Sequence, residues 1–270
     1  MYKRTVVALT GLLTVYLLGY PAIYFGQRWV LFHDVPLADS VRFSFGHPFR
    51  EINFRPEKGV LLNTLLFKTD SVAKRGVVLY FHGNADNLVR WGRYADRFLR
   101  NGYDVWIYDY RQFGKSKGPL TEAGLYRDAE FMYQRVLRAY PEHRVVLYGY
   151  SLGTGMATYV AAQHRPRRLL LEAPYYSIAD LGCRRVPIYP YQSLLRFQFP
   201  TYQRISRVRC PVHVFHGTAD ETVPYASGKR LATVLPQKQA VILTTIVGGR
   251  HKNLAQYEQY NTVLDSLLAR

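Results

Sequence analysis

The stretch "GYSLGTG", residues 149–155, gives the strongest indication of the fold. Ser151 stands in the spacing G-x-S-x-G, after the apolar run 144–150 and before the helix-forming segment 152–164. A serine on a sharp turn between a strand and a helix exposes its hydroxyl, and neighbouring glycines permit such a turn. The short pattern alone arises by chance in roughly one chain in ten of this length. The surrounding sequence must therefore decide whether Ser151 is a nucleophile or a serine in a glycine-rich bend.

The rest of the chain alternates between short apolar runs and amphipathic segments. Strands covered on both faces are expected at 76–81, 103–110, 144–150, 167–173, 211–217 and 240–247. Helices are expected at Asn87–Leu99, Glu122–Arg138, Leu152–Gln163, Tyr225–Leu235 and Leu254–Leu268. Residues 50–56 and 60–69 have the two-residue rhythm of an antiparallel hairpin. The pattern predicts an α/β fold with a mostly parallel, doubly wound sheet and right-handed crossovers.

The first residues, 1–28, are expected to form a membrane anchor. Lys3 and Arg4 are followed by no charged residue from Thr5 to Gln27. A helix of this length can cross a hydrocarbon layer of ~30 Å. A cleaved signal peptide would have a shorter apolar region and a better cleavage site, and a buried core helix is rarely apolar on every face. The sequence therefore favours one uncleaved transmembrane helix, and these two alternatives stay open.

The charges that flank this segment suggest an orientation. Lys3 and Arg4 precede the span and Arg28 follows it. The positive-inside bias then places the start of the chain in the cytoplasm and the main domain, 29–270, outside it. Tyr20 and Tyr24 would suit the interfacial belt of aromatic residues, as would Trp29.

A long insertion interrupts the alternation between Ala173 and Arg209. It is too long for an ordinary connection and is rich in Tyr, Phe, Pro and Arg. Insertions of this kind often form lids, so a small aromatic, helical cap is expected at about 174–209, with an apolar pocket beneath it. A packing surface or a membrane-contacting patch is the alternative.

Composition limits the classes of partner. The 270 residues are 48% hydrophobic and 20% charged, as in a globular protein, and the formal net charge is +17. The basic residues are spread along the chain, with no dense run and no nucleic-acid motif, so an anionic membrane surface is favoured over nucleic acid. Cys183 and Cys210 do not form a metal-binding pair. Cys210 fits a buried apolar position, and a disulfide between the two is the alternative in an oxidising compartment.

A nucleophilic serine needs a base and an acid, and both follow predicted strands. His251 lies in "VGGRHKN" between the last strand and the last helix, and Asp220 lies in "HGTADETVP". The order Ser151, Asp220, His251 is the order that hydrolases with a nucleophile elbow require. His216 is expected to be structural, in the turn before the acid.

The oxyanion hole is expected in "FHGNADN", after the strand 76–81. The backbone N–H groups of Asn84 and Leu152 would be its two donors. His82 is an alternative base, but it precedes a predicted helix and lies far in sequence from the acid.

These motifs, together with "DYRQFGKSKG" at 109–118, resemble the α/β-hydrolase superfamily over nearly the whole chain after the anchor. They look most like the membrane-anchored, short-capped serine hydrolases of the BEM-type, depalmitoylase-like group. The resemblance implies that Ser151 is the nucleophile, Asp220 the acid and His251 the base. Asp86 and Gln112 stand where that group has glycine. An Asp at 86 can cap the next helix and brings a negative charge near the oxyanion site, and Gln112 can alter a turn beside the pocket.

The expected function is hydrolysis of a carboxylic ester or thioester through an acyl-enzyme, with no metal and no organic cofactor. The cap and the anchor favour an apolar acyl substrate, either a lipid or an acylated protein. A peptidase or amidase could use the same triad, and a catalytically silent, membrane-held interaction domain is the alternative from another class. The acyl length, the natural substrate and the oligomeric state do not follow from the sequence.

Overall fold

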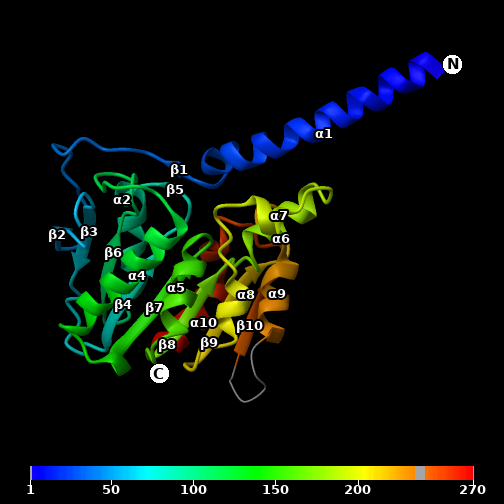
Figure 1. Ribbon diagram of the computed structural model, residues 1–270. Helices are drawn as coiled ribbons and strands as arrows, with labels where there is room; N and C mark the ends of the chain where they lie inside the picture. The colour runs from blue at the N-terminus through cyan, green and yellow to red at the C-terminus, as the bar shows by residue number, and fades with distance from the viewer. Residues whose placement is uncertain (1, 235–240, 270) are drawn as a thin grey trace.

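The computed structural model describes residues 2–234 and 241–269. An eight-stranded sheet has the order β10-β9-β8-β7-β4-β6-β3-β2 (Figure 1). Its strands are β2 (Phe49–Phe54), β3 (Leu62–Phe67), β4 (Gly76–Phe81), β6 (Tyr103–Tyr108), β7 (Val145–Tyr150), β8 (Arg168–Glu172), β9 (Val212–Gly217) and β10 (Val241–Ile246). The hairpin β2–β3 and the pair β3–β6 are antiparallel, and the other neighbours are parallel. The α/β-hydrolase fold with its mostly parallel sheet is thereby confirmed.

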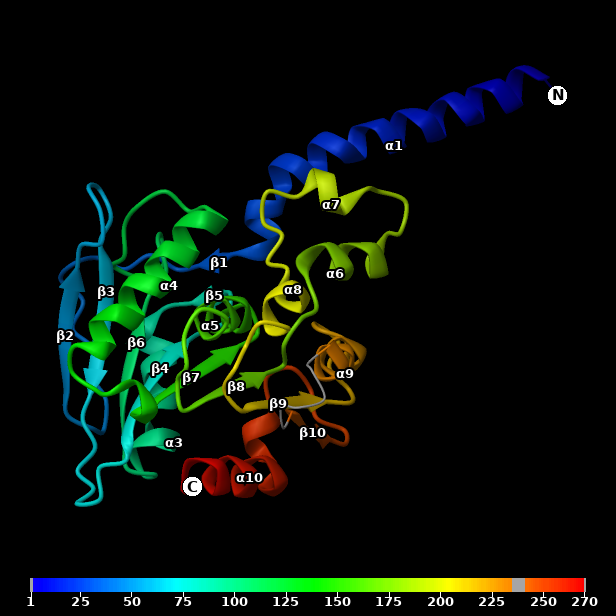
Figure 2. The ribbon, with the colours of Figure 1, turned by 60° about the horizontal axis from the view of Figure 1, so that its bottom comes forward.

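Helices cover both faces of the sheet, which Figure 2 shows edge-on. One face carries α4 (Glu122–Leu137), α5 (Gly153–Ala161), α8 (Thr201–Ile205) and α9 (Tyr225–Val234). The other face carries α2 (Leu88–Trp91), η1 (Gly92–Ala95), α3 (Asp96–Leu99) and α10 (Glu258–Ala269). Every residue of the central strands β4, β6 and β7 is buried. The continuous apolar runs are therefore explained by packing on both sides, as in other parallel sheets.

Several helix bounds differ from those expected. The helix expected at 87–99 is two short α-helices joined by the 3₁₀ turn η1. The last segment begins as the 3₁₀ turn η3 (Leu254–Gln256) before α10. A further 3₁₀ turn, η2 (Glu142–Arg144), precedes β7. The expected helix end at Leu235 and strand start at Ala240 lie outside the described residues.

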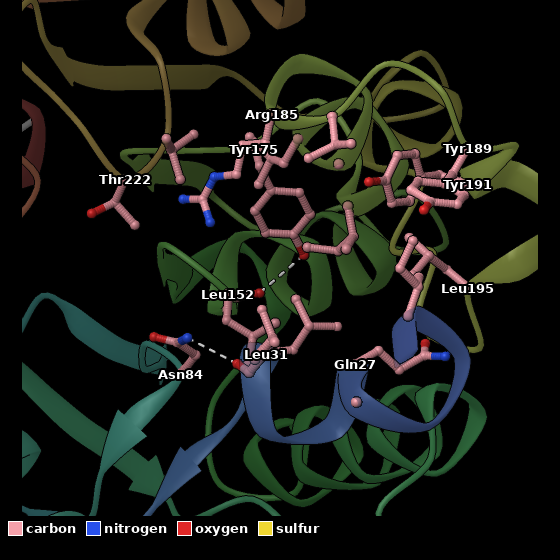
Figure 3. A pocket seen from close by; sticks show the side chains of 18 of the residues that line it. Gln27, Leu31, Asn84, Leu152, Tyr175, Arg185, Tyr189, Tyr191, Leu195 and Thr222 are labelled. Carbon is pink, nitrogen blue, oxygen red and sulfur yellow. Dashed lines mark hydrogen bonds between the residues drawn. The ribbon is translucent and has the colours of Figure 1, made fainter. Parts of the chain in front are cut away.

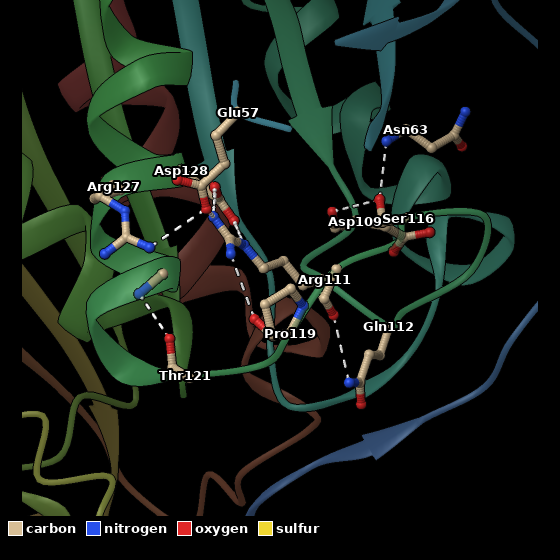
Figure 4. A network of polar contacts seen from close by, with 12 residues as sticks. Glu57, Asn63, Asp109, Arg111, Gln112, Ser116, Pro119, Thr121, Arg127 and Asp128 are labelled. Atoms are coloured by element: carbon tan, nitrogen blue, oxygen red, sulfur yellow. Dashed lines mark hydrogen bonds and ion pairs between the residues drawn. The ribbon is translucent and has the colours of Figure 1, made fainter. Parts of the chain in front are cut away.

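Arg111 fixes the loop that follows β6 to helix α4 (Figure 4). Its guanidinium is fully buried and donates to both carboxylate oxygens of Asp128, each at 2.7 Å, and to Glu57 at 2.7 Å. A bidentate pair of this kind defines both position and orientation. Removing one partner of a buried ion pair typically costs about 3–5 kcal/mol, because it leaves an uncompensated charge. Arg111 therefore ties the loop 109–118 to helix α4 and to Glu57.

Helix α1 (Tyr2–Leu31) projects away from the α/β body, as Figure 1 shows. Its most apolar window has a mean hydropathy of 1.8 and is not buried in the fold, which makes α1 a candidate membrane span. Just after it, β1 (His33–Asp34) pairs in parallel with β5 (Ala85–Asp86). This small second sheet was not predicted, because a two-residue strand has no periodicity to detect. It connects the end of α1 to the loop expected to hold the oxyanion donors.

The insertion 174–209 divides into two parts. Helices α6 (Ile178–Arg185) and α7 (Tyr191–Leu194) stand over the carboxyl edge of the sheet beside α1, as both ribbon views show. Helix α8 instead packs against α5 and α9 within the helical layer. Cys183 and Cys210 are both free thiols, so the alternative of a disulfide between them is wrong.

Candidate active site

Ser151 sits on the turn between β7 and α5 with a left-handed backbone, φ +49°. Its N–H donates to the carbonyl of Glu172 on the neighbouring strand β8 at 2.9 Å. The two glycines of the pattern are needed for close packing. A Cβ on Gly149 would lie 2.7 Å from the Cα of Thr154, and one on Gly153 would lie 2.0 Å from the carbonyl oxygen of Phe81. The strained, glycine-flanked turn is the local geometry of a nucleophile elbow.

The structure brings Ser151, Asp220 and His251 together at the carboxyl edge of the sheet. The Ser151 Oγ lies 2.9 Å from the His251 Nε2, and the His251 Nδ1 lies 2.8 Å from the Asp220 Oδ2. Their exposed fractions are only 6%, 8% and 7% respectively. A further contact, not foreseen from the sequence, is the hydroxyl of Tyr150, which donates to the His251 carbonyl at 2.8 Å. This bond holds the loop that carries the imidazole.

Asp220 is prepared to remain ionised. Burial alone would raise the pKa of its carboxyl, but hydrogen bonds from His216, His251 and the backbone N–H of Val223 outweigh burial and hold the pKa below its ordinary value. The backbone N–H of Thr222 also donates to the Oδ1, at 2.9 Å. An ionised acid can accept the Nδ1–H of an imidazole and leave the Nε2 free to take a proton.

His216 lies in strand β9 rather than in the turn where it was expected. Its Nε2–H donates to the carbonyl of Val223 at 2.9 Å, and the same atom lies 3.4 Å from the Asp220 Oδ2. His216 thus contacts the turn that carries the acid, which supports the structural role expected for it.

The expected oxyanion donors border the same cavity as Ser151. In the described part of the chain, neither the backbone N–H of Asn84 nor that of Leu152 has a protein acceptor. The Asn84 side chain is occupied elsewhere, since its Nδ2 donates to the carbonyl of Leu31 at the end of α1 at 2.8 Å (Figure 3). Both N–H groups remain candidates for the oxyanion site, because no protein group among the described residues accepts from them.

His82 is placed away from the reacting groups. It is fully buried, its Nδ1 donates to the carbonyl of Gly83 at 2.7 Å, and its ring stacks on Tyr110 at 4.1 Å between centroids. Its Nε2 faces Asp109 at 3.5 Å. These contacts favour a structural role over the alternative role as a base.

Asp86 and Gln112 both adopt φ +72°, a conformation that favours glycine. This explains why glycine suits these positions. The expectation that Asp86 caps the next helix is wrong, because Asn87 accepts the N–H of Val89 and is the N-cap of α2. Gln112 instead accepts a hydrogen bond from Arg28 at the end of α1, at 2.9 Å.

A pocket of about 470 Å³ opens beside Ser151 and is mainly apolar (Figure 3). This volume lies within the ordinary range for small-molecule sites. Residues of the cap form one side of it, including Ile178, Leu181, Tyr189 and Tyr191. The other side was not foreseen from the sequence, because it is built by the last third of α1. Within residues 2–234 and 241–269, no cluster of three or more His, Cys, Asp or Glu side chains could hold a metal ion.

Comparison with known proteins gives a consistent result. A family model described as "alpha/beta hydrolase fold" matches residues 76–170. The chain is 27% identical to the lysophosphatidylserine lipase ABHD12 of Danio rerio, over 71% of this chain and 58% of that protein. It is 29% identical to the alpha/beta hydrolase domain-containing protein 17C of Xenopus tropicalis, over 77% of this chain and 66% of that one. A Pyrococcus furiosus esterase superposes with a TM-score of 0.67 at 16% identity, covering 87% of this chain and 96% of the esterase.

Proposed function

The chain belongs to the α/β-hydrolase superfamily, and the proteins it is similar to include a lipase and an esterase, so we propose that it is a serine hydrolase of carboxylic esters or thioesters. The observation that carries the proposal is the pair of hydrogen bonds through His251, 2.9 Å to the Ser151 Oγ and 2.8 Å to Asp220. A hydroxyl, an imidazole and a carboxylate hydrogen-bonded in this order form the arrangement that activates a serine as a nucleophile.

In the proposed reaction, His251 takes the Ser151 proton at Nε2 while the Oγ attacks the carbonyl carbon. The negative oxygen that develops lies between the N–H groups of Asn84 and Leu152, at the amino end of α5. Each such donor contributes about 3 kcal/mol to transition-state stabilisation. The imidazolium then protonates the leaving alcohol or thiol, which leaves an acyl-enzyme. A water molecule, deprotonated by the same imidazole, releases the acid and restores the serine.

The pocket favours an apolar acyl group. Most of its lining is aliphatic or aromatic, and its one charged side chain among the described residues is Arg185. A cation at the pocket is compatible with a neutral or anionic headgroup and unfavourable for a cationic one. We therefore place the substrate among lipid esters and acylated proteins. A peptidase or amidase would use the same triad, and substrate profiling separates the two.

We further propose that the anchor holds residues 29–270, with the cap at 174–209, at a membrane surface on the extracytoplasmic side. The apolar surface of α1 supports anchoring, and the flanking Lys3 and Arg4 support the orientation. Protease protection of closed vesicles tests the side. In vesicles whose extracytoplasmic face is outward, added protease should digest the domain directly. A domain that is digested only after the membrane is permeabilised would contradict the orientation.

The test of the chemistry compares the parent with Ser151→Ala. We expect the parent to hydrolyse p-nitrophenyl esters and to react with a fluorophosphonate probe, and the variant to do neither. Equal ester turnover by the two proteins would refute the assignment of Ser151. A parent that fails both assays would favour the silent interaction domain instead.

A further inference from the structure

Helix α1 is longer than a membrane span needs. Its 30 residues extend about 45 Å at a rise of ~1.5 Å per residue, whereas the hydrocarbon layer is ~30 Å thick. About ten residues are therefore left over, enough for nearly three further turns. The end that adjoins the α/β body is the one that lines the pocket.

Polar contacts fix this end of α1 to the domain on two sides. Toward the cap, the buried side chain of Gln27 accepts the backbone N–H groups of Arg196 at 2.7 Å and Phe197 at 3.2 Å. Toward the oxyanion loop, the Leu31 carbonyl accepts the Asn84 amide. Arg28 forms an ion pair with Asp34 at 2.8 Å as well as its bond to Gln112. The end of α1 is thus positioned as firmly as an element of the domain itself.

One face of α1 lines the pocket. The lining residues recur every three or four positions, which is the spacing of a single helix face. They are Gly19, Ala22, Ile23, Gly26, Gln27, Val30 and Leu31. Between Gly19 and Leu31 this wall extends about 18 Å along the helix axis.

Gly26 leaves open space on this wall. A Cβ built there would meet no atom within 4 Å, whereas a Cβ on Gly19 would collide with the ring of Tyr189. Tyr189 stacks on Tyr16 at 5.2 Å and meets Tyr20 edge-on, so the cap closes onto α1 at that level. The cavity is therefore open at Gly26 and narrow at Gly19.

From these contacts we propose that α1 is a substrate-binding element as well as an anchor. The acyl chain of the substrate lies between α1 and the cap, its carbonyl at Ser151 and its tail along Gly26. Because Gly26 has no side chain, it admits the chain, and its replacement by a larger residue shortens the chain that fits. This inference rests on the proposed function, since it names the residue that sets acyl length at the same site.

The test is Gly26→Leu, with Gly11→Leu as the matched control. Gly11 lies on the same helix, also in open space, but does not line the pocket. Leucine also favours a helix over glycine at both positions, so neither variant should disturb α1. The full-length proteins are compared in micelles by their kcat/KM for p-nitrophenyl laurate and butyrate.

We expect the ratio of kcat/KM for laurate to that for butyrate to fall about tenfold or more in Gly26→Leu. The reason is that each methylene group displaced from an apolar pocket lowers kcat/KM by about that factor. The ratio should stay at the parent value in Gly11→Leu. An unchanged ratio in Gly26→Leu, in a protein that hydrolyses both esters, would overturn the role of α1 while leaving the proposed function intact.

A second measurement does not depend on hydrolysis. The Ser151→Ala protein is irradiated with a diazirine-bearing palmitic acid, with and without excess palmitic acid, and the labelled peptides are identified by mass spectrometry. Labelling of 19–31 that palmitic acid competes away, and that Gly26→Leu reduces, would support the inference. Residues 2–18 lie in the micelle, and their labelling should not be competed by palmitic acid. If the labelling of 19–31 also cannot be competed, the inference is overturned, whether or not any ester is cleaved.

Discussion

Gln27 is a buried polar side chain on a mostly apolar helix, and its replacement by leucine tests how α1 is attached. Its exposed fraction is 5%, and its Oε1 accepts the N–H groups of Arg196 and Phe197. Its Nε2 donates to the carbonyl of Tyr24 at 2.8 Å. Leucine has a similar size and can make none of these bonds. The variant therefore leaves two backbone donors of the cap without their partner.

The size of the effect follows from those two donors. A buried donor without a partner costs about 1–3 kcal/mol, and this applies to the N–H of the buried Phe197. Arg196 is exposed, so its N–H can bind water instead and adds less. Burying the more apolar leucine offsets about 1–2 kcal/mol of this. A net destabilisation of about 1 kcal/mol should lower the Tm by about 2–4 °C for a domain of this size.

The assay is thermal unfolding of the full-length protein in micelles, together with amide hydrogen exchange of the segment 195–199. Exchange at Arg196 and Phe197 should accelerate in Gln27→Leu. The control is Gln163→Leu, because Gln163 is exposed just past the end of α5 and its side chain donates only to the carbonyl of Tyr159 in α5, at 3.2 Å. Equal Tm values and equal exchange in the two variants would refute the attachment of α1 through Gln27.

Four further outcomes are expected. Asp220→Asn should lower kcat about 10⁴-fold in ester hydrolysis, because an amide cannot hold the imidazole in the required tautomer; a loss of less than about tenfold would contradict its role as the acid. Because the folded-state pKa of Asp220 lies below its unfolded value of about 3.9, its carboxylate stabilises the fold above that pH and stops doing so as the pH falls through the folded value. Denaturant titrations between about pH 5 and pH 3 should thus show a steeper loss of unfolding free energy in the parent than in Asp220→Asn. Ser151→Gly should be more stable than Ser151→Ala by about 1 kcal/mol, since only glycine relaxes at φ +49°; differential scanning calorimetry that ranks alanine higher would exclude strain at the elbow. Iodoacetamide should modify the partly exposed Cys183 and spare Cys210, where burial raises the pKa of the thiol to about 12; intact-mass analysis after limited digestion decides this.

The sequence predicts the part of the fold that is periodic. Buried strands such as β4 and β7 are continuous apolar runs, and the residues after parallel strands must meet at one edge of the sheet. That rule is sufficient to bring Ser151, Asp220 and His251 together before any coordinates are known. Their catalytic roles remain a prediction, which the variants above test.

Features that depend on contacts between distant segments could not be predicted. The pairing of β1 with β5 involves two residues on each side, and the attachment of α1 depends on single polar side chains such as Gln27 and Arg28. Nothing in an apolar stretch distinguishes a turn that lies in lipid from one that lines a pocket. The left-handed backbone at Asp86 and Gln112 could not be predicted from these residues either, because neither residue type requires a positive φ.

The contribution of α1 to the pocket has a practical consequence for the choice of expression fragment. Deleting the residues before His33 is the obvious way to obtain a water-soluble enzyme. Such a fragment would lack one side of the cavity and would leave the Asn84 amide without its acceptor, Leu31. Under the proposed function, such a fragment would still cleave small activated esters at Ser151. Its selectivity would be that of an open cleft, and it would misreport what the intact protein prefers.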